Sequence, residues 1–296
     1  MIAFNKYYNK FNILSVLLVS VSLLFLIFKG LNFGIDFKGG TLIELRSSDN
    51  KINVTSLRDN LNQMDLGDVS VKNFGNDTDY LIKFEISDNK NVIEEIKTNL
   101  DKSFGNNFDF RRVENVGPKV SSELLKSGII AISLSLAAML IYIWIRFEWQ
   151  FSLGAIAALF HDVLVTLGLF SLLGLEINLS IIAAVLTIVG YSMNDTVVIF
   201  DRVRDNLKKY IDLHIFDLTN KSINQTLSRT ILTSFTTLLA LLSIFFLGGE
   251  ILKGFSFAMI LGVIVGTYSS IFIANPLLVK LNVNHYTIVK KEENIN

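Results

Sequence analysis

Long apolar blocks constrain the fold of this chain more than any other feature of its sequence. A helix needs about 18–25 apolar residues to cross a hydrocarbon core of roughly 30 Å. Six blocks have this length, at 11–28, 128–145, 151–173, 177–200, 230–247 and 255–279. Charged residues make up 18% of the chain, whereas soluble domains carry about 25%. We therefore predict a polytopic α-helical membrane protein with six transmembrane helices.

Residue counts exclude several classes of function. The formal net charge is +0, so nothing indicates nucleic acid binding. The chain has no cysteine, which excludes disulfides, thiolate metal sites and cysteine catalysis. With 3 histidines, a histidine-rich metal site is not expected either. We therefore expect neither a metal nor a cofactor.

The distribution of Lys and Arg predicts the orientation, because cytoplasmic loops are enriched in these residues. If the N-terminus is inside, twelve of the 13 Lys and Arg that lie outside 29–126 fall on the cytoplasmic side. Only Lys253 falls on the other side. We expect the N-terminal segment 1–10, the loop 201–229 and the tail 280–296 to be cytoplasmic. The first apolar block is interpreted as an uncleaved anchor, since no small-residue cleavage site follows it.

The segment 29–126, between the first two apolar blocks, has the pattern of a separate soluble domain. Alternating strand patterns and amphipathic helix patterns follow one another in the order strand 39–47, helix 53–64, strands 68–74 and 79–87, helix 91–105 and strand 107–116. This β-α-β-β-α-β order predicts an α+β ferredoxin-like domain. The pair Gly39-Gly40 is interpreted as a turn into the first strand. Because no nucleophile–base set or phosphate loop is found, we expect a binding or docking module and not an enzyme.

Three ionisable residues lie within or at the edge of the apolar blocks, namely Asp162, Asp195 and Arg229. Each such residue costs about 2.5–3.5 kcal/mol on insertion scales, so it usually faces the interior of a helix bundle and has a function. At 1.5 Å per residue, Asp195 lies about 9 Å inside the cytoplasmic boundary marked by Asp201. Asp162 lies about 16 Å deep by the same rise. We therefore expect all three residues in the cytoplasmic half of the bilayer.

Small and polar residues accompany these groups at helical spacing. Thr187 and Tyr191 precede Asp195 in steps of four residues, and Thr233 follows Arg229 in the same way. Asn194 is expected to hydrogen-bond across helices. In the sixth block, Gly262-x-x-x-Gly266 is typical of helices that approach one another closely. The pattern predicts polar faces that meet inside the bundle.

These residues suggest proton coupling. Burial favours the protonated form of a carboxyl group, whereas a nearby guanidinium favours the ionised form. Movement of Arg229 relative to Asp195 would therefore change the proton occupancy of that carboxyl group, and we include Asp162 in the same hypothesis. Two simpler interpretations stay open: an Asp195–Arg229 ion pair that fixes helix register, and an Asp162 that only hydrogen-bonds to a neighbouring helix. His161 is interpreted as a polar neighbour and not as a proton relay.

Several motifs resemble the SecF family of bacterial protein export, part of the resistance–nodulation–division superfamily. They are "GIDFKGGTLIEL", "VENVGPKVSSEL", "HDVLVTLG", "GYSMNDTVVIFDRVRDNL" and "INQTLSRTILTSFTTLLALL". The resemblance implies a multi-pass protein of the bacterial inner membrane whose ferredoxin-like domain is periplasmic. SecD would be its pseudo-symmetric mate, with the SecYEG channel, YajC, exported unfolded chains and protons as further partners. In this family the Asp of "NDT" and the Arg of the fifth helix are linked to proton transport, which implies that role for Asp195 and Arg229. Asp162 matches the family's His-Asp pair.

The expected function is that of an accessory subunit of the Sec translocase. With SecD it would use the proton motive force to promote protein export. One alternative is a proton-coupled small-molecule exporter of the same superfamily, which usually needs both halves of the fold in one chain. The other alternative is a structural subunit without its own proton pathway.

Overall fold

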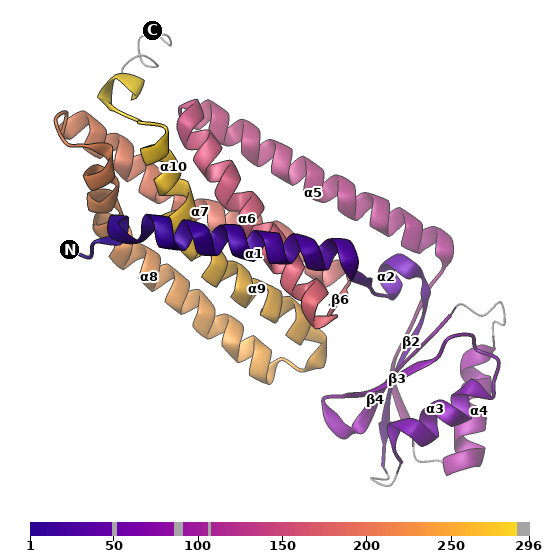
Figure 1. Ribbon diagram of the computed structural model, residues 1–296. Helices are drawn as coiled ribbons and strands as arrows, with labels where there is room; N and C mark the ends of the chain where they lie inside the picture. The colour runs from indigo at the N-terminus through magenta and orange to yellow at the C-terminus, as the bar shows by residue number, and fades with distance from the viewer. Residues whose placement is uncertain (49–51, 86–90, 106–107, 289–296) are drawn as a thin grey trace. The chain divides into compact units, whose positions relative to one another are not determined.

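The computed structural model describes residues 1–48, 52–85, 91–105 and 108–288 (Figure 1). The chain divides into two compact units. The helical unit comprises Met1–Asn32 and Ile130–Asn296, and the α/β unit comprises Phe33–Ile129. The helix α5 (Pro118–Arg146) begins in the α/β unit and ends in the helical unit.

Six helical spans within the described residues are long and apolar enough to cross a membrane. They are formed by η1 (Phe4–Tyr7) with α1 (Tyr8–Phe28), α5, α6 (Trp149–Leu173), α7 (Leu179–Lys209), α8 (Ile215–Leu247), and α9 (Glu250–Ser269) with the π-helical η2 (Ser270–Ala274) and α10 (Asn275–Lys280). The prediction of six transmembrane helices is confirmed. Short elements that the sequence patterns did not predict are β1 (Asn32–Phe33), α2 (Ile35–Lys38) and β6 (Glu176–Ile177).

The helices α6, α7 and α9 form the interior of the helical unit. About half of the apolar window is buried in each of them, 44%, 50% and 50% respectively, against 6% for α5. Glycine allows α9 to lie close to α7: a Cβ on Gly262 would stand 2.2 Å from Cγ1 of Ile188. One on Gly266 would stand 2.9 Å from Cβ of Ser192. The glycine pair therefore permits the close approach that its spacing predicts.

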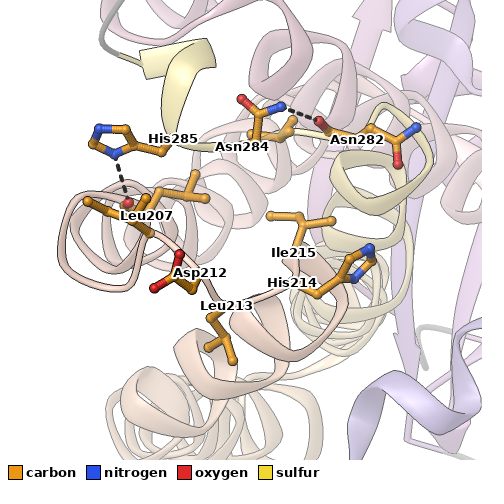
Figure 2. A pocket seen from close by; sticks show the side chains of 10 residues that line it. Leu207, Asp212, Leu213, His214, Ile215, Asn282, Asn284 and His285 are labelled. Carbon is orange, nitrogen blue, oxygen red and sulfur yellow. Dashed lines mark hydrogen bonds between the residues drawn. The ribbon is translucent and has the colours of Figure 1, made fainter.

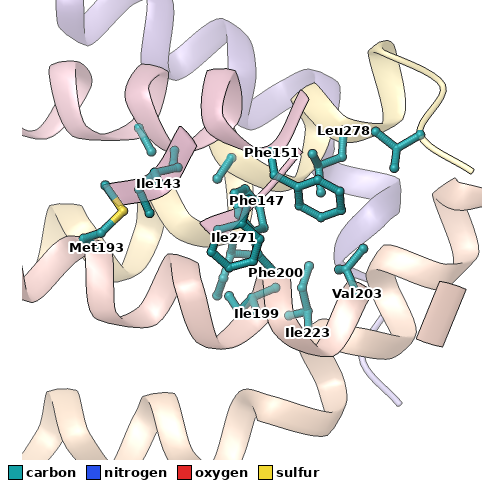
Figure 3. Close-up of a cluster of buried hydrophobic side chains, with 14 of the residues drawn as sticks. Ile143, Phe147, Phe151, Met193, Ile199, Phe200, Val203, Ile223, Ile271 and Leu278 are labelled. Carbon is teal, nitrogen blue, oxygen red and sulfur yellow. The ribbon is translucent and has the colours of Figure 1, made fainter. Parts of the chain in front are cut away.

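Aromatic side chains fill one end of this interior (Figure 3). Phe200 of α7 lies edge-on to Phe151 of α6, with ring centroids 5.2 Å apart. Phe147, in the turn between α5 and α6, lies 6.0 Å from each of these two rings. All three side chains are fully buried, so this cluster fixes α7 against α6 at Phe200.

The segment 201–229, expected as a loop, is mostly helical. The helix α7 continues to Lys209 and α8 begins at Ile215, so only 210–214 lies between them. The polar segment has a buried apolar face, formed by Val203, Leu207, Leu218 and Ile223. Asn206 Nδ2 also donates to Ser222 Oγ and Gln225 Oε1, each at 2.8 Å. The helices therefore continue beyond the apolar blocks, because packing between them replaces burial in lipid.

The α/β unit contains a four-stranded antiparallel sheet with two helices. Its elements are β2 (Gly40–Ser47), α3 (Val54–Asn62), β3 (Ser70–Phe74), β4 (Asn76–Phe84), α4 (Val92–Phe104) and β5 (Phe108–Val116). The strand order is β3-β4-β2-β5, and every neighbouring pair is antiparallel. This arrangement confirms the predicted ferredoxin-like fold.

Alternating and helical patterns produce this unit as predicted. Leu57 and Leu61 of α3 and Ile96 and Leu100 of α4 are fully buried and belong to one cluster with the apolar residues of the sheet. Asn53 Oδ1 caps α3 by accepting from the backbone N of Ser56 at 2.8 Å. The described part of the predicted strand 79–87 ends at Phe84, and residues 86 and 87 lie outside the described residues.

The sheet depends on a glycine at the start of β2 and contains an ion pair between β2 and β4. Gly40 has φ +132, and a Cβ there would stand 2.9 Å from the carbonyl oxygen of Phe84, so glycine is required where the chain enters β2. Arg46 Nε and Nη2 donate to Asp79 Oδ1 and Oδ2 at 2.5 and 2.6 Å. This hydrogen-bonded pair across β2 and β4 holds the pKa of Asp79 below its ordinary value.

Candidate functional site

Asp162 lies in a polar cluster where α6, α7 and α9 meet. The residue is 0% exposed. Ser192 of α7 donates from Oγ to Asp162 Oδ2 at 2.5 Å, and Ser269 of α9 donates to the same oxygen at 2.7 Å. His161 Nδ1 lies 2.9 Å from the other carboxylate oxygen. One carboxyl group therefore links the three interior helices.

The helix α9 changes to a π-helix directly after Ser269. Ser270, the first residue of the π-helical turn, lies 2.8 Å from Thr196 of α7, hydroxyl to hydroxyl. Asn275 Nδ2 donates to the carbonyl of Ser270 at 2.7 Å. Single π-helical turns inside longer helices frequently occur at functional sites. Here the turn extends the polar cluster around Asp162 towards α10.

Asp195 of α7 has a different environment. The residue is 4% exposed. Thr267 of α9 lies nearby, but its hydroxyl lies 2.8 Å from Ser234 Oγ of α8, and within the described residues no hydrogen bond joins it to Asp195. Among the described residues, its Oδ2 atom is buried and has no hydrogen-bond partner. Asp195 is therefore a buried acid with one free oxygen, whereas the carboxyl group of Asp162 is hydrogen-bonded at both oxygens.

Arg229 of α8 is exposed at the surface of the helical unit. It lies near enough to Asp195 to interact electrostatically. No ion pair within 4.0 Å joins the two side chains in the described part of the chain. Thr233 Oγ1 donates to the carbonyl of Arg229 at 3.0 Å, so its hydroxyl is used within α8. Arg229 and Asp195 therefore lie near one another without forming an ion pair.

The predicted polar stripe on α7 does not form one buried face. Tyr191 is half-buried, and its hydroxyl has no hydrogen-bond partner in the described structure. Thr187 is exposed and donates to the carbonyl of Ala183 in its own helix at 2.8 Å. Asn194 is exposed as well. Because four residues advance about 40° beyond a full turn, the row rotates from the buried face at Asp195 to the surface at Thr187.

The structure also reveals site residues that the sequence patterns did not single out, namely Ser192, Ser269, Ser270, Thr196 and Thr267. All are hydroxyl residues with a partner on another helix, which for Thr267 is Ser234 of α8. Hydroxyl residues are common in transmembrane helices because they can bond to their own backbone. Ser192 precedes Asp195 by three residues and Thr196 follows Ser192 by four, and this helical spacing offered a signal for both residues on α7. The residues on α9 and η2 required knowledge of how the helices pack.

A separate cavity of about 320 Å³ lies beside the turn between α7 and α8. Figure 2 shows His285 on its rim, where Nδ1 lies 3.1 Å from the carbonyl oxygen of Leu207. His214 lines the same cavity. None of the predicted site residues lines this cavity, so it is distinct from the polar cluster inside the bundle.

Comparisons with family models agree with these features. The C-terminal model of the protein export membrane proteins SecD/SecF matches residues 95–284. The SecD/SecF GG motif model matches residues 24–50, which include Gly39 and Gly40. The first match contains Asp162, Asp195 and Arg229.

Curated relatives and solved structures show the same similarity. The chain is 48% identical to the protein translocase subunit SecF of Rickettsia akari, over 89% of this chain and 86% of that one. It is 44% identical to the SecF subunit of Cereibacter sphaeroides, over 91% and 86%. The crystal structure of SecDF, a translocon-associated membrane protein from Thermus thermophilus, matches with a TM-score of 0.85 and 37% identity. That match covers 95% of this chain and 38% of the solved one.

Proposed function

The chain belongs to the SecF family of protein translocase subunits, and on this basis we propose that it works with SecD as a proton-driven accessory subunit of protein export. The relatives bear the name of a translocase subunit, which supports a transport role and not an enzymatic one. The chain covers 38% of the solved SecDF chain, so a SecD partner would provide the remaining part of such an assembly.

The environment of Asp195 is the observation that carries the proton-coupling proposal. A buried carboxyl group with a free oxygen favours the protonated form, because ionisation in a medium of low polarity is expensive. Arg229 is near enough to oppose this effect and, being exposed and outside any direct ion pair, is able to move. A change in their separation would load or release a proton. Each proton that crosses the membrane supplies about 2.3 kcal/mol per 100 mV.

Asp162 is proposed as the second carboxyl group of the proton-coupling set. Its hydrogen bonds to Ser192 and Ser269 join α7 and α9 to α6. A proton on the carboxyl group would remove one acceptor site and weaken one of these links. Asp162 would in this way make helix packing depend on proton occupancy.

Polar side chains on the surface of α7 and α8 support a partner inside the membrane. Thr187, Asn194 and Arg229 are exposed in the chain alone, although polar groups that face lipid are expensive. A SecD subunit covering this surface would remove them from lipid and complete the surroundings of Asp195. SecYEG, YajC and the exported chain are proposed partners on the strength of family membership.

The proposed orientation has both termini in the cytoplasm and the α/β unit in the periplasm of a bacterial inner membrane. It rests on the excess of Lys and Arg at one end of the bundle. Lys208, Lys209 and Lys221 belong to the end where α7 and α8 are joined.

Translocation of an exported protein into inverted membrane vesicles tests the proposed function. We expect Asp195→Asn, assembled with SecD, to lose the part of export that depends on the proton gradient, because the amide is nearly the same shape but binds no proton. Asp205→Asn is the matched control, since Asp205 is an exposed carboxylate on the same helix. Gradient-dependent export that survives in Asp195→Asn with SecD bound would contradict the proposal and favour a structural role.

A further inference from the structure

The junction between α5 and α6 makes the main contacts of α5 with the rest of the helical unit. Along most of its length α5 is exposed: Ile129, Leu134 and Trp144 are 58%, 64% and 71% exposed. Near its C-terminal end Ile143 is 0% exposed, and Phe147 directly after the helix is also 0% exposed. The helix is therefore anchored at one end.

The anchoring partner is α7, the helix that carries Asp195. Arg146 Nη2 lies 2.8 Å from Asp201 Oδ1. Arg204 Nη2 lies 3.3 Å from Glu148 Oε1, and Arg204 Nη1 donates to the carbonyl of Arg146 at 3.4 Å. The Arg204–Glu148 contact is an ion pair without hydrogen-bond alignment, since Glu148 Oε1 has no hydrogen-bond partner in the described structure.

Aromatic packing reinforces these ion pairs. The guanidinium carbons of Arg146 and Arg204 lie 5.0 and 5.5 Å from the ring centroid of Phe147. The same ring packs on Phe200 with centroids 6.0 Å apart (Figure 3). The Glu148 and Arg204 side chains are 4% and 17% exposed, so solvent screens this pair less than the half-exposed Arg146–Asp201 pair.

These contacts restrain α7 close to Asp195. Asp201 and Arg204 follow Asp195 by six and nine residues on one continuous helix, about 9 and 14 Å along its axis. From the α5–α6 junction back towards the α/β unit, α5 is a single helix of 29 residues, about 43 Å long. It starts at Pro118, two residues after the end of β5 in the α/β unit. The covalent path from β5 therefore leads through α5 to the α5–α6 junction, and the side chains of that junction contact α7.

We propose that Arg146, Phe147 and Glu148 couple α7 to α5, so that a movement of α7 linked to the proton occupancy of Asp195 displaces α5 and the strand β5. These three residues position α7 and do not themselves carry the proton. The inference rests on the proposed proton-coupled function, because it names the route by which that site acts on the α/β unit.

A single introduced cysteine tests this route, because the chain has none of its own. Val120, near the start of α5, is 51% exposed, and a maleimide would label Val120→Cys in the complex with SecD. We expect the labelling rate to change at least twofold when a proton gradient is applied. Asp195→Asn abolishes this change. The pair of near-isosteric substitutions Glu148→Gln and Asp201→Asn reduces it to less than half.

Two further variants show whether a weaker labelling response comes from loss of the ion pair or from misfolding. The charge exchange Arg146→Asp with Asp201→Arg restores the pair, and we expect it to respond more strongly than either single reversal. Arg202→Gln is the matched control, since Arg202 is an exposed cation on the same turn of α7, and it should respond like the wild type.

The outcomes separate the two proposals. A gradient response that is lost in Asp195→Asn but unchanged in Glu148→Gln/Asp201→Asn overturns the coupling route and leaves the proposed function intact. The route is also overturned if the Val120→Cys chain without other substitutions shows no labelling response, in vesicles whose export still depends on Asp195. If neither labelling nor export responds to Asp195→Asn, the proposed function itself fails.

Discussion

Replacing Asp162 by two different residues separates its charge from its hydrogen bonds. Asp162→Ala removes the acceptor of Ser192 and Ser269 and the partner of His161. Ser269 keeps an alternative acceptor, the carbonyl of Gly266 at 3.1 Å. Asp162→Asn preserves the network, because its amide oxygen accepts from both hydroxyls while its NH₂ group faces His161 Nδ1. The two substitutions therefore differ in packing but share the loss of the ionisable group.

The expected change in the free energy of unfolding follows from the kind of hydrogen bond that is lost. An interhelical hydrogen bond between side chains in a membrane protein contributes about 0.6 kcal/mol on average and about 1.7 at most. Loss of two such bonds predicts that Asp162→Ala lowers the free energy of unfolding by about 1–3 kcal/mol. We expect Asp162→Asn to lie within about 0.5 kcal/mol of the wild type, because each bond has a replacement.

Denaturant unfolding of the complex in detergent measures these differences, and gradient-driven export measures function in the same variants. We expect Asp162→Asn to be stable and yet deficient in gradient-driven export. An Asp162→Ala variant as stable as the wild type would refute the view that this carboxyl group holds the three helices together. Normal export by Asp162→Asn would limit Asp162 to the structural role that was the simpler interpretation of the sequence.

Three further predictions follow from other parts of the chain. Arg229→Ala should abolish gradient-driven export but leave SecD co-purification normal, because it removes one side chain from the surface that we propose SecD covers and leaves Thr187 and Asn194 in place; loss of SecD binding would contradict this. A Cβ at Gly168 would stand 2.6 Å from Cα of Ser22, so Gly168→Ala should destabilise the chain in thermal unfolding by about 1–3 kcal/mol. Gly190→Ala, where nothing lies within 4 Å, serves as its control. Because the Arg46 pair lowers the folded pKa of Asp79, its stabilisation should be present above pH of about 4 and be lost as the pH falls through that lower pKa. Hydrogen exchange of β4 in wild type and Asp79→Asn should differ at pH 7 and converge in acid, and equal protection at pH 7 would contradict the argument.

The architecture was predictable because buried positions are occupied by apolar residues, which recur along the sequence in blocks or at helix and strand spacing. The apolar blocks and the β-α-β-β-α-β pattern were sufficient for the six helices and the ferredoxin-like unit. The ends of α7 and α8 were not predictable from apolar length, because Val203, Leu207 and Leu218 pack within protein and not in lipid. The π-helical turn at Ser270–Ala274 depends on contacts with α7 that a single helix does not reveal.

The candidate site was predictable only in part. Asp162 and Asp195 were evident because a carboxyl group in an apolar run is unusual. The difference between them was not: both are buried, but Asp162 accepts hydrogen bonds from two other helices, whereas Asp195 keeps a free oxygen. That difference comes from which serines and threonines face each carboxyl group, and it depends on the rotation of α9 against α7.

Proton movement during export tests the central claim most directly. The measurement uses proteoliposomes that contain this chain, SecD and the translocon, with a pH-sensitive dye inside and an imposed proton gradient. We predict that export by the wild-type complex is accompanied by proton flux and that Asp195→Asn, with SecD still bound, shows neither this flux nor the faster export. Flux and gradient-driven export that persist in Asp195→Asn would contradict the account.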